Sequence, residues 1–327
     1  MKRFLIGLLS LTLVFSLVAC GDGGNDSEPA SAENFPEKEI EVIVAYKAGG
    51  GTDVGARVLA EAAGEYFGKP LVIQNIDGSD GELGYNRLAD AKPDGYTVGF
   101  INLPTIVSLT LERNTKFELD DFEPIMNHVY DAGVLVVQDS SEFKTLDDFV
   151  DFAKANPEEI RISNNGTGAS NHIGAAHFAH EADIEVTHVP FGGSTDMLAA
   201  LRGGHVEATV AKISEVAGLV NAGELRILAS FTDERLDGFE DVPTLGEEGY
   251  DILFGSARAL VAPKGTPQEI LDILHDKFKE ALESDEHMQG AANADLPIRY
   301  MSPEELSQYI ADEEAYLKEI GEIIDLN

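Results

Sequence analysis

The pattern of apolar positions changes from strand-like to helix-like near residue 49. Residues 40–46 read I-E-V-I-V-A-Y, an apolar, β-branched run that is typical of a buried strand. Three glycines (Gly49, Gly50 and Gly51) interrupt the run, and a helical pattern then continues to about residue 67. The segment therefore predicts a strand, a tight loop and a helix, with the loop at the carboxyl end of the strand.

This loop has the composition of an anion site. Glycines lack Cβ atoms, so a ligand can approach their backbone closely. Thr52 and Asp53 can cap the following helix, whose free N–H groups and dipole attract negative charge. A plain turn without a ligand would use the same residues, and this stretch alone does not decide between the two interpretations.

Strands and helices keep alternating along the chain, which predicts parallel βαβ units. We expect further strands at residues 71–76, 96–102, 133–137, 160–163, 185–189, 206–210, 225–230 and 254–262. We expect further helices ending near residue 91 and spanning 145–155, 171–182, 194–201, 267–284 and 303–324. Small-residue loops at 77–84, 164–170 and 190–194 precede helices, as the first glycine loop does.

Two α/β units with glycine loops at one edge predict a two-lobed clamshell. Each lobe would be a mostly parallel sheet flanked by helices, with the ligand in the interdomain cleft. We expect residues 37–132 plus 256–327 to form lobe 1 and residues 133–255 to form lobe 2. A length of 327 residues suits two such cores.

The N-terminus reads as a targeting segment. Lys2 and Arg3 precede an apolar run, which ends in L-V-A-C-G, a sequence like a bacterial lipobox. We expect residues 1–20 to be a lipoprotein signal peptide, with Cys20 lipidated and anchoring the protein to the outer face of the cell membrane. Residues 21–36 would be a flexible tether. A signal anchor with an incidental cysteine is the alternative.

Composition and motifs exclude several functions. The 23 Lys and Arg residues against 59 Asp and Glu give a net charge of −36, which argues against nucleic acid as a partner. Val54 breaks a dinucleotide fingerprint that would begin at Gly49, and no P-loop, H-E-x-x-H or G-x-S-x-G motif is present. We therefore expect no cofactor, metal or catalytic residue. His172 follows a glycine loop and could line the cleft.

An ordered set of short motifs resembles one known family, the extracytoplasmic solute receptors (Bug/TctC-like) of tripartite tricarboxylate transporters. The motifs cover nearly all of the expected mature chain. They are G-G-G-T-D at 49–53 with Arg57, Q-N-x-x-G-x-x-G at 74–81, P-D-G-Y-T at 93–97, G-x-G-x-x-x-H at 166–172, V-P-F-x-G at 189–193, R-G-G-x-V at 202–206, D-V-P-T at 241–244 and A-P-x-G-T-P at 262–267.

The resemblance implies a type II, periplasmic-binding-protein-like clamshell. It also implies a non-enzymatic receptor that captures a small di- or tricarboxylate and delivers it to integral-membrane permease subunits. It also implies that two loops of lobe 1 hold one carboxylate and that loops of lobe 2 meet the other end of the ligand. We expect the receptor to be monomeric. The ligand-binding residues expected on this basis are Gly49, Gly50, Gly51, Thr52, Asp53, Gly78, Ser79, Asp80, Gly81, Gly168, Ser170, His172, Phe191, Gly193 and Arg258.

Two residues make this expectation specific to this chain. Asp80 stands where the family usually has a small residue, and its carboxylate should weaken anion binding unless it points away or holds a cation. Arg258 could fork onto a second carboxylate, or it could be a surface or hinge arginine. Two other functions stay open at this stage: an α/β hydrolase-like or other small-carboxylate enzyme, and a ligand-sensing receptor for a signalling partner.

Overall fold

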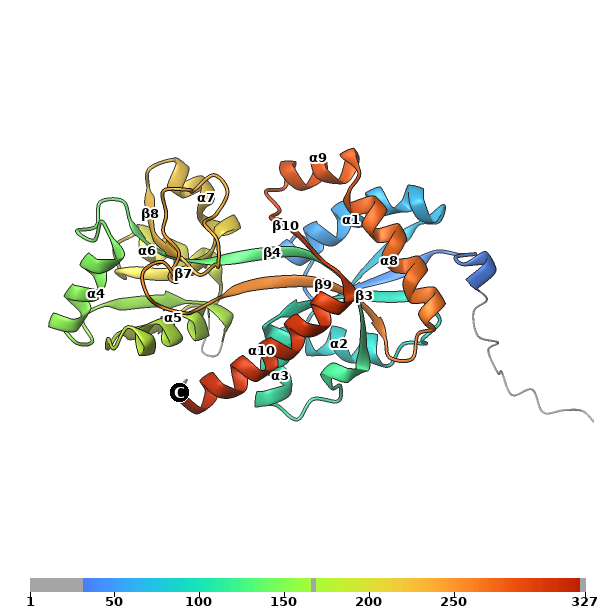
Figure 1. Cartoon of the computed structure of the whole chain (residues 1–327), viewed down its shortest axis with the longest axis horizontal. Helices are drawn as coiled ribbons and strands as arrows, with labels where there is room; N and C mark the ends of the chain where they lie inside the picture. The colour runs from blue at the N-terminus through green and yellow to red at the C-terminus, as the bar shows by residue number, and fades with distance from the viewer. Residues whose placement is uncertain (1–31, 166–168, 324–327) are drawn as a thin grey trace, which may run out of the picture.

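The structure, a computed structural model, describes residues 32–165 and 169–323, which form two α/β lobes joined by long strands (Figure 1). Its sheet has ten strands in the order β2-β1-β3-β9-β4-β7-β5-β6, and β8 and β10 also pair with β4. The strands are β1 (Ile40–Val44), β2 (Leu71–Asn75), β3 (Thr97–Leu103), β4 (Phe122–Gln138), β5 (Arg161–Asn164), β6 (Thr187–Pro190), β7 (Ala208–Lys212), β8 (Leu225–Ser230), β9 (Gly255–Pro263) and β10 (Ile298–Met301).

Helices cover both faces of this sheet in each lobe. They are α1 (Gly51–Phe67), α2 (Glu82–Ala89), α3 (Thr105–Glu112), α4 (Leu146–Ala155), α5 (Ser170–Glu181), α6 (Ser194–Arg202), α7 (Ile213–Asn221), α8 (Gln268–Leu282), α9 (Asp285–Asn293) and α10 (Pro303–Ile323), with 3₁₀ turns η1 (Ala32–Asn34), η2 (Ser79–Gly81) and η3 (Leu119–Asp121). Within the described residues, we find no helix with the length and apolar character needed to cross a membrane.

The two lobes share the strand β4. Its residues 122–132 pair with β9, and its residues 133–138 pair with both β7 and β8 (Figure 1). The predicted two-lobed α/β architecture is confirmed, with one correction. The sheets are not mostly parallel: β1, β2 and β3 pair in parallel, as do β5, β6 and β7, but β4 and β9 are antiparallel to their partners.

The change of partners along β4 supports the expected lobe boundaries, which stay a prediction. Strands that pass between lobes leave only short segments at which the two bodies can rotate relative to each other. The expected signal peptide and most of the expected tether lie outside the described residues.

The C-terminal helix α10 contacts both lobes. Leu317 and Ile320 of α10 pack in one apolar cluster with Ile173 and Ala176 of α5, although α5 belongs to the second lobe. The Tyr316 hydroxyl is also hydrogen-bonded to a ring nitrogen of His177 on α5. Because α10 follows β10 of the first lobe, this packing ties the two lobes together.

Candidate functional site

A cleft of about 370 Å³ opens between the two lobes. It lies at the ends of strands where α3 and α5 begin, as expected for ligand sites in α/β sheets. Asp80 and Ser170, predicted in different lobes, both line it. Its full lining is Tyr46, Asp80, Thr105, Ser108, Leu109, Glu112, Arg113, Asn165, Ala169 and Ser170.

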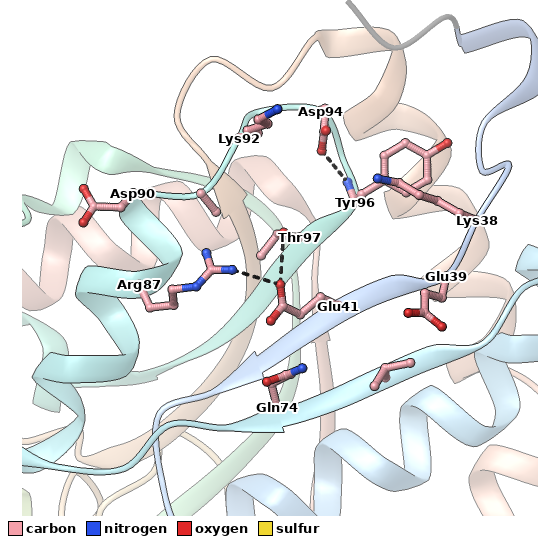
Figure 2. A pocket seen from close by; sticks show the side chains of 12 residues that line it. Lys38, Glu39, Glu41, Gln74, Arg87, Asp90, Lys92, Asp94, Tyr96 and Thr97 are labelled. Atoms are coloured by element: carbon pink, nitrogen blue, oxygen red, sulfur yellow. Dashed lines mark hydrogen bonds and ion pairs between the residues drawn. The ribbon is translucent and has the colours of Figure 1, made fainter. Parts of the chain in front are cut away.

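A second pocket, of about 510 Å³, lies at the opposite strand ends of lobe 1 (Figure 2). Glu41 near the start of β1 accepts hydrogen bonds there from Arg87 at 3.2 Å and from Thr97 at 3.5 Å. The amino ends of parallel strands are not where α/β sheets bind ligands. We therefore place the candidate site in the interlobe cleft and not in this pocket.

The first glycine loop is held in shape by Asp53. Its buried carboxylate, 2% exposed, accepts hydrogen bonds from the backbone N–H of Gly49 at 2.8 Å, from Asn75 at 2.9 Å and from Nε of Arg57 at 3.0 Å. Burial raises the pKa of Asp53, but the hydrogen bonds from Arg57, Gly49 and Asn75 outweigh it and leave this pKa below its ordinary value. Asp53 therefore shapes the loop from within, and these three hydrogen bonds engage both oxygens of its carboxylate.

Thr52, like Asp53, supports the first glycine loop from within. It is buried, and its hydroxyl accepts a hydrogen bond from the side-chain amide of Asn102 at 2.9 Å. Gly49, Gly50 and Gly51, in contrast, are exposed. Of the five residues predicted in this loop, the glycines offer the backbone and the other two support it.

Arg258 lies against this loop. A Cβ atom added at Gly51, the first residue of α1, would stand 2.9 Å from Nη2 of Arg258, a contact too close for a real side chain. The arginine side chain is 13% exposed, and its Nη2 donates to Asp131 at 3.2 Å. The guanidinium has five N–H donors, so an anion at the start of α1 can accept from those that Asp131 does not use.

This position changes the expected role of Arg258. The sequence suggested that it could bind a second carboxylate, but its guanidinium belongs with the first glycine loop. Asp131, which is fully buried, also accepts a hydrogen bond from the backbone N–H of Ser214 on α7 at 3.1 Å. Arg258 is thus fixed by a carboxylate that also contacts the second lobe, which favours a role in the cleft over a free surface arginine.

The second glycine loop contains Asp80, which is paired with a cation. Arg113, just after α3, donates to the Asp80 carboxylate and, at 3.3 Å, to the carbonyl of Ser79. The Asp80 side chain is 65% exposed, so this ion pair contributes little stability. It does offset part of the negative charge that we expected to oppose an anion, although Arg113 also lies 3.7 Å from a carboxylate oxygen of Glu82. The loop needs glycine at Gly81, where φ is +101° and a Cβ atom would stand 2.9 Å from the ring of Tyr85.

Tyr46 lines the cleft beside the second glycine loop, and the sequence prediction missed it. Its hydroxyl lies 2.8 Å from that of Tyr85, which accepts a hydrogen bond from the backbone of Asn102 at 3.3 Å. Burial raises the pKa of Tyr46 to about 12, so it stays a neutral hydrogen-bonding group, and the charges of Asp80 and Arg258 both act on it. The sequence does place Tyr46 directly after the apolar run of β1, at the strand end where a ligand is expected, and this position could have identified it as a site residue.

In the second lobe, the predicted residues do not all lie at the cleft. Ser170 begins α5 at the cleft, and its hydroxyl accepts a hydrogen bond from Nζ of Lys212 at 3.3 Å. His172 is buried, and its ring packs edge-on against His188 with 4.6 Å between ring centroids. Burial lowers the pKa of both histidines, that of His188 to about 4. Gly168 lies outside the described residues.

The remaining loop of lobe 2 does not reach the described cleft lining. Phe191 packs against the apolar cluster that includes Met197, and its backbone N–H donates to the carbonyl of Asn164 at 2.8 Å. Gly193 precedes α6, with open space where a side chain would project. No cluster of three or more potential metal ligands is found in residues 32–165 and 169–323.

Comparison with known proteins identifies the family of this chain. A family described as "Tripartite tricarboxylate transporter family receptor" matches residues 55–326. The UPF0065 protein in the gbd 5' region of Cupriavidus necator is 33% identical over 299 residues, which are 89% of this chain and 90% of that protein.

Solved structures resemble the fold as well. A ligand-free TctC solute binding protein from Polaromonas superposes with a TM-score of 0.81 at 31% identity, over 88% of this chain and 99% of that one. R. palustris Rpa4515, solved with adipate, superposes with a TM-score of 0.75 at 26% identity, over 89% of this chain and 98% of that one. The resemblance noted in the sequence is confirmed: the chain belongs to the tripartite tricarboxylate transporter receptor family, whose members are substrate-binding receptors.

Proposed function

We propose that this protein is an extracytoplasmic receptor that binds a small di- or tricarboxylate between its lobes and delivers it to the permease of a tripartite tricarboxylate-type transporter. The observation that carries the proposal is the position of Arg258 against Gly51, which places a fixed guanidinium at the positive end of α1. A structural relative solved with adipate, a dicarboxylate, supports the same ligand class.

The net charge of −36 is compatible with binding an anion. Exposed charges are screened beyond about 8 Å at physiological salt, whereas donors inside a closing cleft act at contact distance. Micromolar affinity needs about 8 kcal/mol. Several charge-assisted hydrogen bonds at about 1.5–3 kcal/mol each supply that amount.

The receptor acts as a monomer without catalysis, and lipid on Cys20 anchors it to the outer face of the membrane. The L-V-A-C-G sequence supports the anchor. Mass spectrometry of protein from a bacterial membrane fraction tests it: a diacylglyceryl adduct should be found on Cys20, and Cys20→Ser should release the protein. An unmodified Cys20 in the membrane-bound protein would contradict the anchor.

A thermal-shift screen followed by calorimetry tests the ligand class. Ligand at a hundredfold excess over Kd stabilises the folded state by about 2.7 kcal/mol, which is easily detected. Di- and tricarboxylates should give the largest shifts, and incubation with them should leave them chemically unchanged. No response to any of them, or their turnover by pure protein, would refute the proposed function.

A further inference from the structure

Lys212, at the end of β7, is a buried cation whose charge is not matched by a close carboxylate. Its side chain is 8% exposed, and Nζ lies 3.3 Å from the hydroxyl of Ser170 and 3.9 Å from the ring centroid of Phe254. In the described part of the chain, no carboxylate oxygen lies within 4.0 Å of this ammonium. A buried ammonium without a paired anion is energetically unfavourable.

The carboxylates that surround Lys212 have other partners. Asp131 holds Arg258 and the start of α7, while Glu215 accepts from the backbone N–H of Lys212 itself at 3.1 Å. Burial raises the pKa of Glu313 on α10 to about 7, so that this group is only partly charged at neutral pH. No carboxylate therefore pairs directly with the Lys212 ammonium, although Glu215, Asp131 and Glu313 all act on it from beyond ion-pair distance.

We propose that Lys212 is the second-lobe anchor for the distal carboxylate of the ligand, which it holds together with the Ser170 hydroxyl and the first N–H groups of α5. Ser170 is both the first residue of this 12-residue helix and part of the cleft lining, so the ammonium lies directly behind the cleft wall. This inference rests on the proposed receptor function and assigns its selectivity to one residue.

The arrangement selects ligands that carry two carboxylates. Arg258 and the start of α1 receive one from the first lobe, and Lys212 and the start of α5 receive the other from the second lobe. A monocarboxylate of the same chain length satisfies only one of these cations. Because the anchors lie on opposite lobes, a ligand that bridges them also favours the closed form.

Binding at Lys212 also has a protonation signature. Burial lowers the pKa of Lys212 to about 8, against favourable contributions from Glu215, Asp131 and Glu313 and an unfavourable one from Arg258. An anion beside the ammonium favours its charged form, so this pKa rises on binding. At pH 8 the wild-type protein should therefore take up about half a proton for each dicarboxylate bound.

Calorimetry on Lys212→Met tests the assignment. Methionine keeps the buried, unbranched shape and removes the charge, and Lys144→Met is the matched control, because Lys144 is exposed on lobe 2 with Nζ donating to the Asp139 carbonyl at 3.0 Å. The probes are succinate, adipate and citrate, with butyrate and hexanoate as monocarboxylates. Titrations at pH 8 in two buffers of different ionisation enthalpy measure the proton uptake.

We expect Lys212→Met to weaken the best dicarboxylate or tricarboxylate at least tenfold and to abolish the proton uptake. Monocarboxylate affinity should change less than twofold, and Lys144→Met should behave as wild type. Because burial outweighs the surrounding carboxylates and disfavours the Lys212 ammonium, its removal should leave the ligand-free melting temperature unchanged or higher. If Lys212→Met does not fold, Ser170→Ala replaces it, with an expected loss of affinity for dicarboxylates and not for monocarboxylates.

The outcomes separate the two proposals. Tight dicarboxylate binding with unchanged affinity and proton uptake in Lys212→Met, or in Ser170→Ala where that variant is used, overturns the role of Lys212 and leaves the receptor function intact. A wild-type protein that binds none of the five probes and no other di- or tricarboxylate overturns both.

Discussion

Replacing Gly51 with alanine tests the first anion loop directly. The added Cβ atom would stand 2.9 Å from Nη2 and 3.1 Å from Cζ of Arg258, so the guanidinium must move away from the start of α1. The same atom occupies part of the space through which a carboxylate reaches the backbone. The sequence predicts Gly50 as a ligand-binding residue as well. Substitution of Gly50 is the weaker test, because a Cβ atom there meets only the carbonyl of Lys47 at 3.3 Å.

The size of the effect follows from the interaction that is lost. One charge-assisted hydrogen bond contributes about 1.5–3 kcal/mol, which corresponds to a fall in affinity of about 10- to 150-fold. Folding should not suffer, because alanine is favoured over glycine within a helix by about 0.5–1 kcal/mol. Loss of binding without loss of stability is therefore the expected combination.

A matched control lies in the same helix. A Cβ atom added at Gly64 of α1 would project into open space, so Gly64→Ala should raise stability slightly and leave affinity unchanged. Affinity is measured by isothermal titration with the strongest ligand of the carboxylate screen, and stability by urea unfolding without ligand. Equal affinities for Gly51→Ala, Gly64→Ala and wild type would refute the assignment of this loop.

Two further predictions concern charged and titratable groups. Arg113→Gln leaves the Asp80 carboxylate without its cation, so carboxylate affinity should fall several-fold and recover in the double variant with Asp80→Asn; an unchanged single variant would mean that Asp80 lies too far from the ligand to matter. Burial, with His287 and Arg258 nearby, lowers the pKa of His128 from 6.5 to about 3, so the folded state resists protonation and its stability falls as pH drops below 6.5. The loss at pH 5 is about 2 kcal/mol, and His128→Gln should flatten the curve of unfolding free energy between pH 7 and 5; an equally steep curve would exclude this histidine as the cause.

Local sequence pattern predicts the strands well where each one is a regular apolar run that is followed by a helix. Residues 40–103 and 160–230 alternate between apolar runs and glycine-led helices, and there the predicted strands lie within a few residues of those observed. The first half of β4 was missed because it is buried on both sides and bulged against β9 twice, so its sequence shows no period of two. Helix α9 was missed because only His287 and Ala291 of its residues are buried, which leaves no apolar stripe to detect.

Some residues of the candidate site can be predicted from local sequence, whereas others are brought to it only by the tertiary fold. The glycine loops are local, since three adjacent glycines and a helix start need no distant residue to be recognised. The cations that give these loops their chemistry come from elsewhere: Arg113 is 33 residues from Asp80, and Lys212 is 42 residues from Ser170. With 59 carboxylates and 23 Lys and Arg residues, the composition allows many pairings and indicates only that anions should be repelled on average. A few cations fixed at helix starts outweigh that average, because inside a cleft the nearest charges act at contact distance while the remaining ones are screened. Arg258 has N–H donors beyond the one that Asp131 accepts, and we propose that Lys212, which has no carboxylate within 4.0 Å in the described part of the chain, is the second cation that binds the ligand.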